Sequence, residues 1–331
     1  MAVTNKNAAS REGLVRTSGV NPEIARGVAV GQHFRFLDSL PTISNQFADG
    51  VAVIDLPVGL YTYRAFNLSI ANTVAIAGET ISEAGGFRIN WANFAKYVDS
   101  IDIEIDGKVQ MSYTSDELLD LNEAMRWNVK DGFHWLCFGS PGFFNDYPLA
   151  EDAYLLGTGN IRSLRLLVKL KAAWANTMSL KLACEYAPVN RPVSYIVTMR
   201  TQRYVLPAVG ETTISDIPHG VDLSAIWVRG MNAKRINGFS LKVDDQLMFD
   251  CNAAQYASLG QLWGKDHSQL AAGNLFIDFW REGNPNKGLA SLTADAMVRR
   301  NADIRLTLDM GEAGAEIKII TMHAGEFRYQ K

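Results

Sequence analysis

The feature that most constrains this chain is an internal repetition, in which short patterns of the first half return in the same order in the second. Asp55–Gly59 (DLPVG) matches Asp216–Gly220 (DIPHG), and Ile101–Gln110 matches Phe239–Met248, where an apolar alternation ends in an acidic turn. The other matched pairs are Thr114–Glu117 with Asn252–Gln255, Leu149–Tyr154 with Leu292–Met297, Leu164–Leu166 with Ile304–Leu306, and Ser179–Leu182 with Glu316–Ile319. Six matches in one order predict that the chain contains one domain twice.

Within each half, short segments alternate between apolar and polar residues, which is the period of a strand with one buried face. Ile101, Ile103 and Ile105, for example, alternate with acidic residues. The same alternation recurs at Leu164–Leu170, Leu180–Cys184, Phe239–Val243, Leu275–Phe279, Ile304–Met310 and Ile317–Ile319. Many short alternating strands separated by turns are typical of sandwiches or barrels rather than βαβ units, so we predict an all-β fold.

Each half also predicts one short helix after the acidic turn. Thr114 precedes Glu117 by three positions, as Asn252 precedes Gln255, and this is the spacing of a capping box. The apolar positions that follow coincide at a constant separation, as Leu118 with Tyr256, Leu121 with Leu259 and Met125 with Trp263. Their spacing of three and four residues places them on one helical face.

The repetition divides the chain into an N-terminal arm (1–48), a first β domain (49–189) and a second β domain (190–331). The boundary falls at Pro188–Pro192, where two prolines stiffen a short connection. The first domain is longer by about 23 residues, which we place near 71–91. Long insertions between strands are usually functional or interface loops.

The arm differs from the rest of the chain, because it has five basic residues against three acidic ones and no sustained apolar period. Two interpretations stay open. It is either a poorly ordered tail or an arm that becomes ordered only on a partner surface.

Composition excludes several other classes of protein. The formal net charge of -3 and the pI near 6.0 argue against a dedicated nucleic-acid binder, which would be strongly basic. Cys137, Cys184 and Cys251 are too far apart for a CxxC site and too few for a disulfide framework, which is consistent with a reducing compartment. No charge-free run reaches the roughly 20 residues that span a bilayer. Met1–Lys6 lacks a signal-peptide core, so we expect no Sec export.

The chain offers no catalytic signature. His33, His134, His219, His267 and His323 are isolated, and none forms an HxH, HxxxH or HExxH motif. There is also no GxSxG elbow, P-loop or GxGxxG motif. We therefore predict no catalytic residue, no cofactor-binding residue and no enzyme activity. The imidazole of His134 lies in an apolar strand pattern, which favours a core or interface residue with satisfied hydrogen bonds over a metal ligand.

Acidic residues gather in a few places, and these are Asp99, Asp102, Glu104 and Asp106, then Glu151 with Asp152, and Asp244 with Asp245. The favoured interpretation is solvated strand faces and turns. The alternative is a hard-cation site, such as structural Ca²⁺ between subunits, whose ligands the sequence leaves unknown.

Aromatic residues are concentrated after the first predicted helix. Phe133, Trp135 and Phe138 have no basic stripe beside them, so core and subunit contacts explain them better than stacking on single-stranded nucleic acid. Gly139–Phe144 (GSPGFF) predicts a turn that ends in two exposed aromatics, and exposed aromatics often mark an interface.

Two tandem β domains, each with a DLPxG-like segment and a strand–acidic turn–helix unit, resemble a known family. They resemble the double jelly-roll major capsid proteins of tailless, membrane-containing icosahedral viruses, most closely those of the corticoviruses. The resemblance runs from about Val53 to Gly325 and depends on the order and spacing of its segments. These are Leu56–Gly59 with Tyr61, Ile105–Lys108, Ile214–Pro218, Phe239–Asp245 and Phe276–Gly283. The long arm and the extra residues of the first domain depart from the family's pattern.

The resemblance implies that 49–189 and 190–331 are eight-stranded jelly rolls and that three chains form a six-lobed, pseudo-hexagonal capsomer. It further implies an icosahedral bacteriophage shell, assembled in the host cytoplasm over an internal membrane. Its partners would be neighbouring capsomers, penton or minor capsid proteins and, through the basic arm, anionic lipid headgroups. Sequence-specific nucleic-acid binding is not expected. The alternative function is that of a carbohydrate-binding or carbohydrate-active tandem β-sandwich protein.

Overall fold

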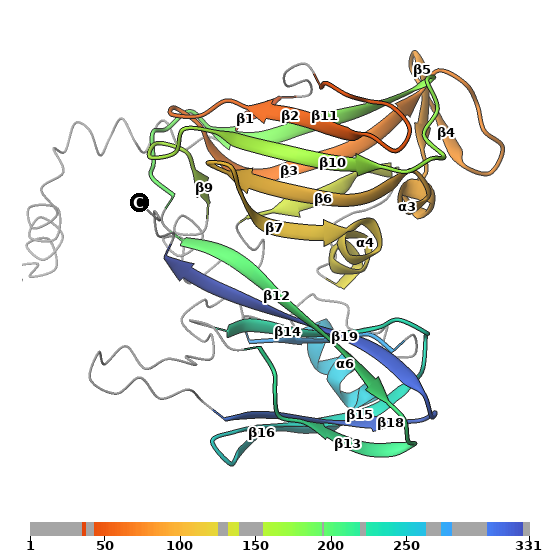
Figure 1. Cartoon of the computed structure of the whole chain (residues 1–331), viewed down its shortest axis with the longest axis vertical. Helices are drawn as coiled ribbons and strands as arrows, with labels where there is room; N and C mark the ends of the chain where they lie inside the picture. The colour runs from red at the N-terminus through yellow and green to blue at the C-terminus, as the bar shows by residue number, and fades with distance from the viewer. Residues whose placement is uncertain are drawn as a thin grey trace, which may run out of the picture.

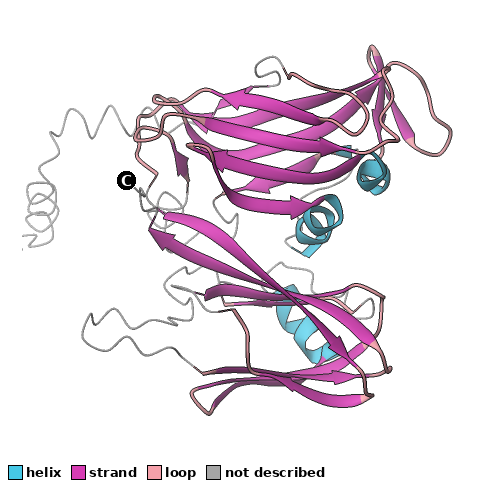
Figure 2. Cartoon of the chain, in the orientation of Figure 1, coloured by secondary structure: helices cyan, strands magenta, loops and turns pink. Residues whose placement is uncertain are grey.

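The computed structural model describes residues 35–37, 43–124, 132–138, 155–193, 195–218, 223–262, 273–279 and 303–326. Strands dominate these ranges and form four sheets, in which neighbouring strands pair antiparallel (Figures 1 and 2). Two sheets use strands from the first half of the chain alone, and the other two use strands from the second half alone. The prediction of an all-β protein built as two tandem jelly rolls is confirmed.

Within the described residues, the first half contains two sheets and three short helical segments. Its strands are β1 (Arg35–Leu37), β2 (Val51–Leu56), β3 (Thr62–Asn72), β4 (Thr80–Glu83), β5 (Gly86–Ile89), β6 (Val98–Ile105), β7 (Lys108–Thr114), β8 (His134–Cys137), β9 (Leu156–Gly157), β10 (Leu164–Leu170) and β11 (Met178–Ala187). The helical segments are η1 (Trp91–Asn93), α3 (Phe94–Tyr97) and α4 (Ser115–Ala124). One sheet has the order β1-β11-β3-β5-β4, with β8 and β9 also paired to β3, and the other has the order β2-β10-β6-β7.

The second half repeats this arrangement. Its elements are β12 (Tyr195–Leu206), β13 (Gly210–Ile214), β14 (Leu223–Gly230), β15 (Ile236–Val243), β16 (Gln246–Asn252), α6 (Ala253–Leu262), β17 (Leu275–Asp278), β18 (Ile304–Met310) and β19 (Ala315–Glu326). The sheet β12-β19-β14-β17 corresponds to β1-β11-β3-β8, and β13-β18-β15-β16 corresponds to β2-β10-β6-β7. The repetition seen in the sequence is therefore a repetition of strand order.

Strand register supports the same correspondence. Ile101 pairs with Tyr113 on β7 and with Val168 on β10. Its counterpart Phe239 pairs with Cys251 on β16 and with Leu308 on β18. The apolar members of these alternating strands point into the sandwiches and are buried. The pattern of alternation alone thus determines which face of each strand enters the core.

The acidic turns at Asp106 and Asp244 have the same structural role in the two halves. Asp106 and Asp244 both have φ near 50°, a left-handed conformation that aspartate tolerates better than most residues. The Asp106 carboxylate accepts hydrogen bonds from the backbone N–H groups of Arg162 (2.7 Å) and Ser163 (2.9 Å). The Asp244 carboxylate accepts one from the N–H of Asp303 at 3.0 Å. Each aspartate therefore ties its hairpin to the chain that enters the neighbouring strand.

Both predicted capping boxes are confirmed. The Thr114 hydroxyl accepts a hydrogen bond from the Glu117 N–H, and the Glu117 carboxylate accepts one from the Thr114 N–H. Asn252 and Gln255 make the same reciprocal pair. Leu118 and Tyr256 then bury the equivalent faces of α4 and α6, while Met125 and Trp263 lie outside the described residues.

The halves differ where the sequence predicted an insertion. In the first half, β4 and β5 form a hairpin that extends the sheet beyond β3, with Ala71 opposite Arg88 and Asn72 opposite Phe87. In the second half, β14 leads to β15 through residues 231–235 alone. Most of the arm lies outside the described residues, although β1, within 1–48, pairs with β11. The limits of the arm, domains and insertion stay predictions.

Candidate functional site: the contact between the two halves

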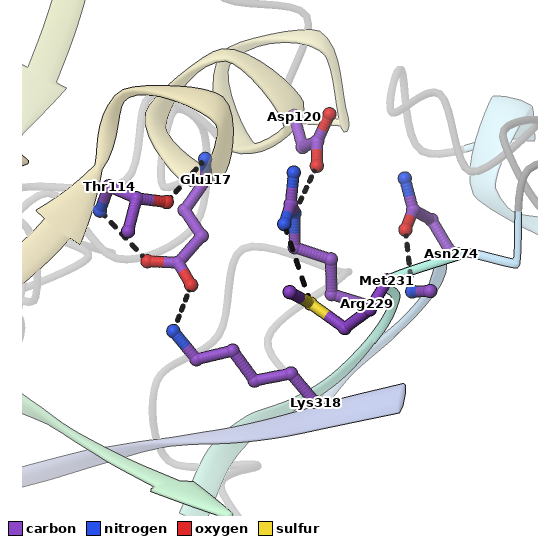
Figure 3. A network of polar contacts seen from close by, with 8 residues as sticks. Thr114, Glu117, Asp120, Arg229, Met231, Asn274 and Lys318 are labelled. Carbon is purple, nitrogen blue, oxygen red and sulfur yellow. Dashed lines mark hydrogen bonds and ion pairs between the residues drawn. The ribbon is translucent and has the colours of Figure 1, made fainter. Parts of the chain in front are cut away.

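The two halves meet where α4 of the first faces the sheet β12-β19-β14-β17 of the second (Figure 1). Figure 3 shows that acidic side chains from α4 meet basic side chains from β14 and β19. Glu117 pairs with Lys318, and Asp120 pairs with Arg229 at 2.7 Å between Oδ2 and Nε. The contact is therefore held in part by two ion pairs between segments far apart in the chain.

Glu117 has two roles at this contact. One carboxylate oxygen, Oε2, accepts the N–H of Thr114 at 2.9 Å and caps α4. The other, Oε1, accepts a hydrogen bond from Lys318 Nζ (Figure 3). The Glu117 side chain is only 3% exposed, so its charge depends on these two partners for the stabilisation that water would otherwise give.

In the pair of Asp120 and Arg229, burial and charge have opposite effects on the pKa of Asp120. Burial raises the pKa of Asp120 above its ordinary value, while the hydrogen bond and the positive charge of Arg229 act in the opposite direction. Arg229 also approaches the Met231 sulfur at 3.8 Å, and the Asn274 side chain accepts the Gly230 N–H at 3.1 Å (Figure 3). The Arg229 guanidinium thus contacts both Asp120 of α4 and Met231, which directly follows β14.

Apolar packing makes up the rest of the contact. Ala225, Trp227, Phe276 and Ile320 belong to the second half, but they pack in the same buried cluster as the core of the first half. Their neighbours in sequence, such as Ile226, pack in the core of the second half instead. The strand β14 is consequently buried on both faces, which is why its sequence LSAIWV has no polar alternation.

His134 is a core residue, as predicted, but within the described residues the expectation that its ring is satisfied by hydrogen bonds is wrong. Its side chain is fully buried on β8, and its ring centroid lies 3.9 Å from that of Phe94. Neither ring nitrogen has a hydrogen-bond partner among the described residues. Burial lowers the pKa of His134 to about 3, so the imidazole is neutral at physiological pH. His323 is also buried, beside the Thr321 hydroxyl, whereas His33, His219 and His267 lie outside the described residues.

The remaining acidic residues that were singled out make pairs within their own sheets. Asp99 pairs with Lys169 at 2.8 Å, Glu104 lies 3.6 Å from Arg165, and Asp245 lies 3.2 Å from Arg305. Asp102 accepts a hydrogen bond from Ser112. These contacts agree with the interpretation as solvated strand faces and turns.

In the part of the chain that the structure describes, no three His, Cys, Asp or Glu residues are grouped to hold a metal ion. Glu151 and Asp152 fall outside it, and the Ca²⁺ alternative between subunits stays a prediction.

The aromatic residues after α4 divide between core and surface. Phe138 packs edge-on against Phe66 in the core. Trp135 lies on the outer face of β8, where it meets Phe36 of β1 at 6.5 Å between ring centroids. Phe133 lies under the Arg88 guanidinium at 3.7 Å. The Gly139–Phe144 turn is outside the described residues, and the three cysteines are thiols.

The contact between the halves was not predicted from the sequence. The continuous apolar run in β14 was a usable signal, because a strand buried on both faces needs a second layer against it. The partners of Glu117 and Asp120 left no such signal, because they lie 201 and 109 residues away. Among the described helices, none has the length and apolar character needed to cross a bilayer.

Two tandem sandwiches whose corresponding strands follow the same order are the mark of a double jelly-roll fold. No protein-family model matches the chain, and no curated protein matches it in sequence. Solved structures do match it. The major capsid protein P2 of bacteriophage PM2 has a TM-score of 0.72 at 20% identity, over 90% of this chain and 99% of that one.

Two further capsid structures have the same fold. The major capsid protein of Sulfolobus turreted icosahedral virus has a TM-score of 0.57 at 12% identity, over 88% of this chain and 96% of that one. The capsid structure of the virus PBCV-1 gives a TM-score of 0.51 at 8% identity, over 88% and 93%. The likeness to double jelly-roll major capsid proteins, predicted from the sequence, is confirmed at the level of the fold.

Proposed function

We propose that this chain is the major capsid protein of an icosahedral bacteriophage and that three copies form a pseudo-hexagonal capsomer. The observation that carries the proposal is the pair of jelly rolls with one strand order, covering nearly the full length of capsid proteins with the same fold. A threefold assembly of a duplicated chain presents six similar lobes, which suits a near-hexagonal lattice. The role is structural and needs no catalytic residue.

The shell would enclose an internal membrane, and the arm would reach its anionic headgroups or a neighbouring capsomer. The excess of basic residues in 1–48 supports this role, since each basic residue near an anionic surface contributes about 1 kcal/mol. Neighbouring capsomers and penton or minor capsid proteins complete the set of partners. The site of action is the virion, after assembly in the host cytoplasm.

The oligomer is the first test. The purified full-length chain should give the mass of a trimer by light scattering, and negative-stain images should show particles of hexagonal outline. A monomer at every concentration would overturn the proposal. Binding of that monomer to a glycan array would support the alternative, a carbohydrate-binding tandem sandwich.

The arm has its own test. Deleting residues 1–34 keeps β1, so the shortened chain should still form trimers, whereas shell assembly and flotation with anionic liposomes should be impaired. The matched control replaces the five basic residues of the arm by glutamine at full length. Unchanged assembly and flotation in both variants would remove the arm from the proposal.

A further inference from the structure

The segment that joins the two jelly rolls, residues 188–193, is bound to the first half by hydrogen bonds. The Thr62 hydroxyl on β3 donates to the Val189 carbonyl at 2.8 Å. Two residues further on, the Arg191 carbonyl accepts the Gly159 N–H at 2.6 Å. The connection is therefore fixed by specific partners in the first half, in addition to its two prolines.

Asn160 binds the far end of the joining segment. Its side chain accepts the Val193 N–H at 2.7 Å through Oδ1 and donates to the Val193 carbonyl at 3.5 Å through Nδ2. Val193 is buried and packs in the core of the first half, and so does Ile196 near the start of β12. The first strand of the second half thus begins at a point that is anchored in the first half.

Two glycines make room for the joining segment. A Cβ atom at Gly157 would lie 2.3 Å from the Pro192 carbonyl oxygen, and one at Gly159 would lie 1.8 Å from Asn190 Oδ1 and 2.9 Å from the Arg191 carbonyl oxygen. Neither glycine has a positive φ. Glycine is therefore needed at both positions because the two backbones approach closely, and not because of its conformational freedom.

The turn at residues 157–160 is itself firmly attached to the first half. Thr158 is fully buried, and its hydroxyl donates to the Tyr61 carbonyl at 2.6 Å. The Thr158 carbonyl accepts the Gly59 N–H at 3.2 Å. The joining segment is consequently held by a part of the first jelly roll that cannot move without breaking these contacts.

We propose that the turn 157–160 and the joining segment 188–193 form a clamp that fixes the orientation of the second jelly roll relative to the first. The clamp ends just before β12, whereas the ion pair of Glu117 with Lys318 lies opposite Arg203 on the same strand. Tyr195 and Arg203 are eight positions apart, which is roughly 26 Å in a strand. One contact would leave a hinge, but two contacts so far apart, with apolar packing between the halves, prevent rotation.

The clamp does not depend on the proposed function, but its consequence for the capsomer does. A trimer presents six similar lobes only if the two jelly rolls of every chain have the same fixed relation. A chain that is already fixed in this relation loses less conformational freedom when it associates. The clamp should therefore favour both trimer formation and regular packing of capsomers.

Gly157→Ala tests the clamp by adding a methyl group where the joining segment passes. The added Cβ should displace the segment from the turn, because the atom that it meets belongs to the Pro192 backbone. The matched control is Gly325→Ala on β19, where a Cβ meets no atom within 4 Å. Both variants make the same chemical change within a strand.

Asn160→Ala is a milder second variant, which decides the test if Gly157→Ala fails to fold. It removes both hydrogen bonds to Val193 and adds no atoms. The matched control is Asn232→Ala, because Asn232 Oδ1 accepts the Glu316 N–H at 3.1 Å and its Nδ2 donates to the Gly314 carbonyl at 2.8 Å. The control thus removes the same two kinds of bond within the second half alone.

The measurement is the distance between spin labels on the two halves of the full-length chain, by double electron–electron resonance. The labels are attached through Ser82→Cys on β4 and Glu211→Cys on β13, two exposed positions. Cys137 and Cys251 are replaced by alanine, whereas Cys184 is fully buried and stays. Labelled chains are diluted with unlabelled chains, so that only distances within one chain are recorded.

The wild-type chain and both controls should give one narrow distance distribution, and Gly157→Ala and Asn160→Ala should broaden it. Amide hydrogen exchange of residues 188–196 should also become at least about tenfold faster in the two clamp variants. An unchanged distribution in the clamp variants, or equal broadening in Asn232→Ala, would overturn the clamp. A wild-type chain that forms no trimer would overturn the proposed function instead, because the distances within one chain still test the clamp.

Discussion

The two jelly rolls have corresponding strand orders, but their helices α4 and α6 differ in charge and in burial. The first half presents an acidic α4 whose Glu117 and Asp120 are covered by a basic sheet, and the second presents a neutral α6 whose equivalent face is open. The first half also has the β4–β5 hairpin, which the second lacks. The two halves therefore share the sandwich and its acidic turns, whereas their helix surfaces and the β4–β5 hairpin differ.

The largest effect is expected from breaking the apolar contact between the halves. Trp227→Ala removes a side chain that is 2% exposed, and the loss of buried surface with the cavity left behind should cost about 3–5 kcal/mol. Urea unfolding followed by circular dichroism measures the change. The control Val205→Ala lies in the same sheet at 69% exposure and should cost less than about 0.5 kcal/mol. Equal costs for the two variants would contradict the assignment of Trp227 to the contact.

The next effect compares two counterpart lysines. Lys318→Met leaves the Glu117 carboxylate buried without its cation and should destabilise the single chain by about 2–4 kcal/mol. Lys181→Met changes an exposed residue and should cost less than about 0.5 kcal/mol. Urea unfolding of both variants at low protein concentration provides the comparison. If both lysines had similar effects, the asymmetry between the halves would be wrong.

The third prediction uses the buried histidine, whose counterpart in the second half is Leu275 by strand register. Burial lowers the pKa of His134 to about 3, below the value of about 6.5 in the unfolded chain. The neutral folded form is therefore fully favoured above pH 6.5, and stability is lost as the pH falls from 6.5 toward 3.

At pH 5 that loss should be about 2 kcal/mol relative to pH 7. His134→Leu should remove it, because leucine does not bind a proton. Urea unfolding of wild type and variant at the two pH values measures the difference. An identical pH dependence of the two proteins would show that His134 does not control acid stability.

The smallest effect is expected in the hairpin that only the first half has. The hydrogen bonds of Lys96 and Tyr97 lower the pKa of Glu79, with the Lys96 contribution the larger. Lys96→Met should let that pKa rise toward its ordinary value, as measured by carboxyl NMR. Because the Lys96 side chain is half exposed and ion pairs near the surface contribute little, the melting temperature should change by less than about 2 °C. A larger change would mean that the hairpin contributes more to stability than its exposure suggests.

Local features of the fold could be predicted, and the candidate site could be predicted only in part. The alternation at Ile101–Ile105, the two capping boxes and the acidic turns depend on residues within a few positions of one another. The prediction for His134 as a core residue followed from the same alternation. The contact between α4 and the second half was missed, because its ion pairs join strand and helix positions 109 and 201 residues apart.

The repetition of one β sandwich could be predicted from the sequence, because periodicity, turn residues and caps act over short distances and recur in order. The tertiary structure alone decided which copy of the shared helix is buried. Glu117 and Gln255 occupy equivalent positions and cap their helices in the same way, so nothing local distinguishes their burial. The distinction arises because the second sandwich covers α4 with Lys318 and Arg229, whereas the equivalent positions of α6 are exposed in the described part of the chain.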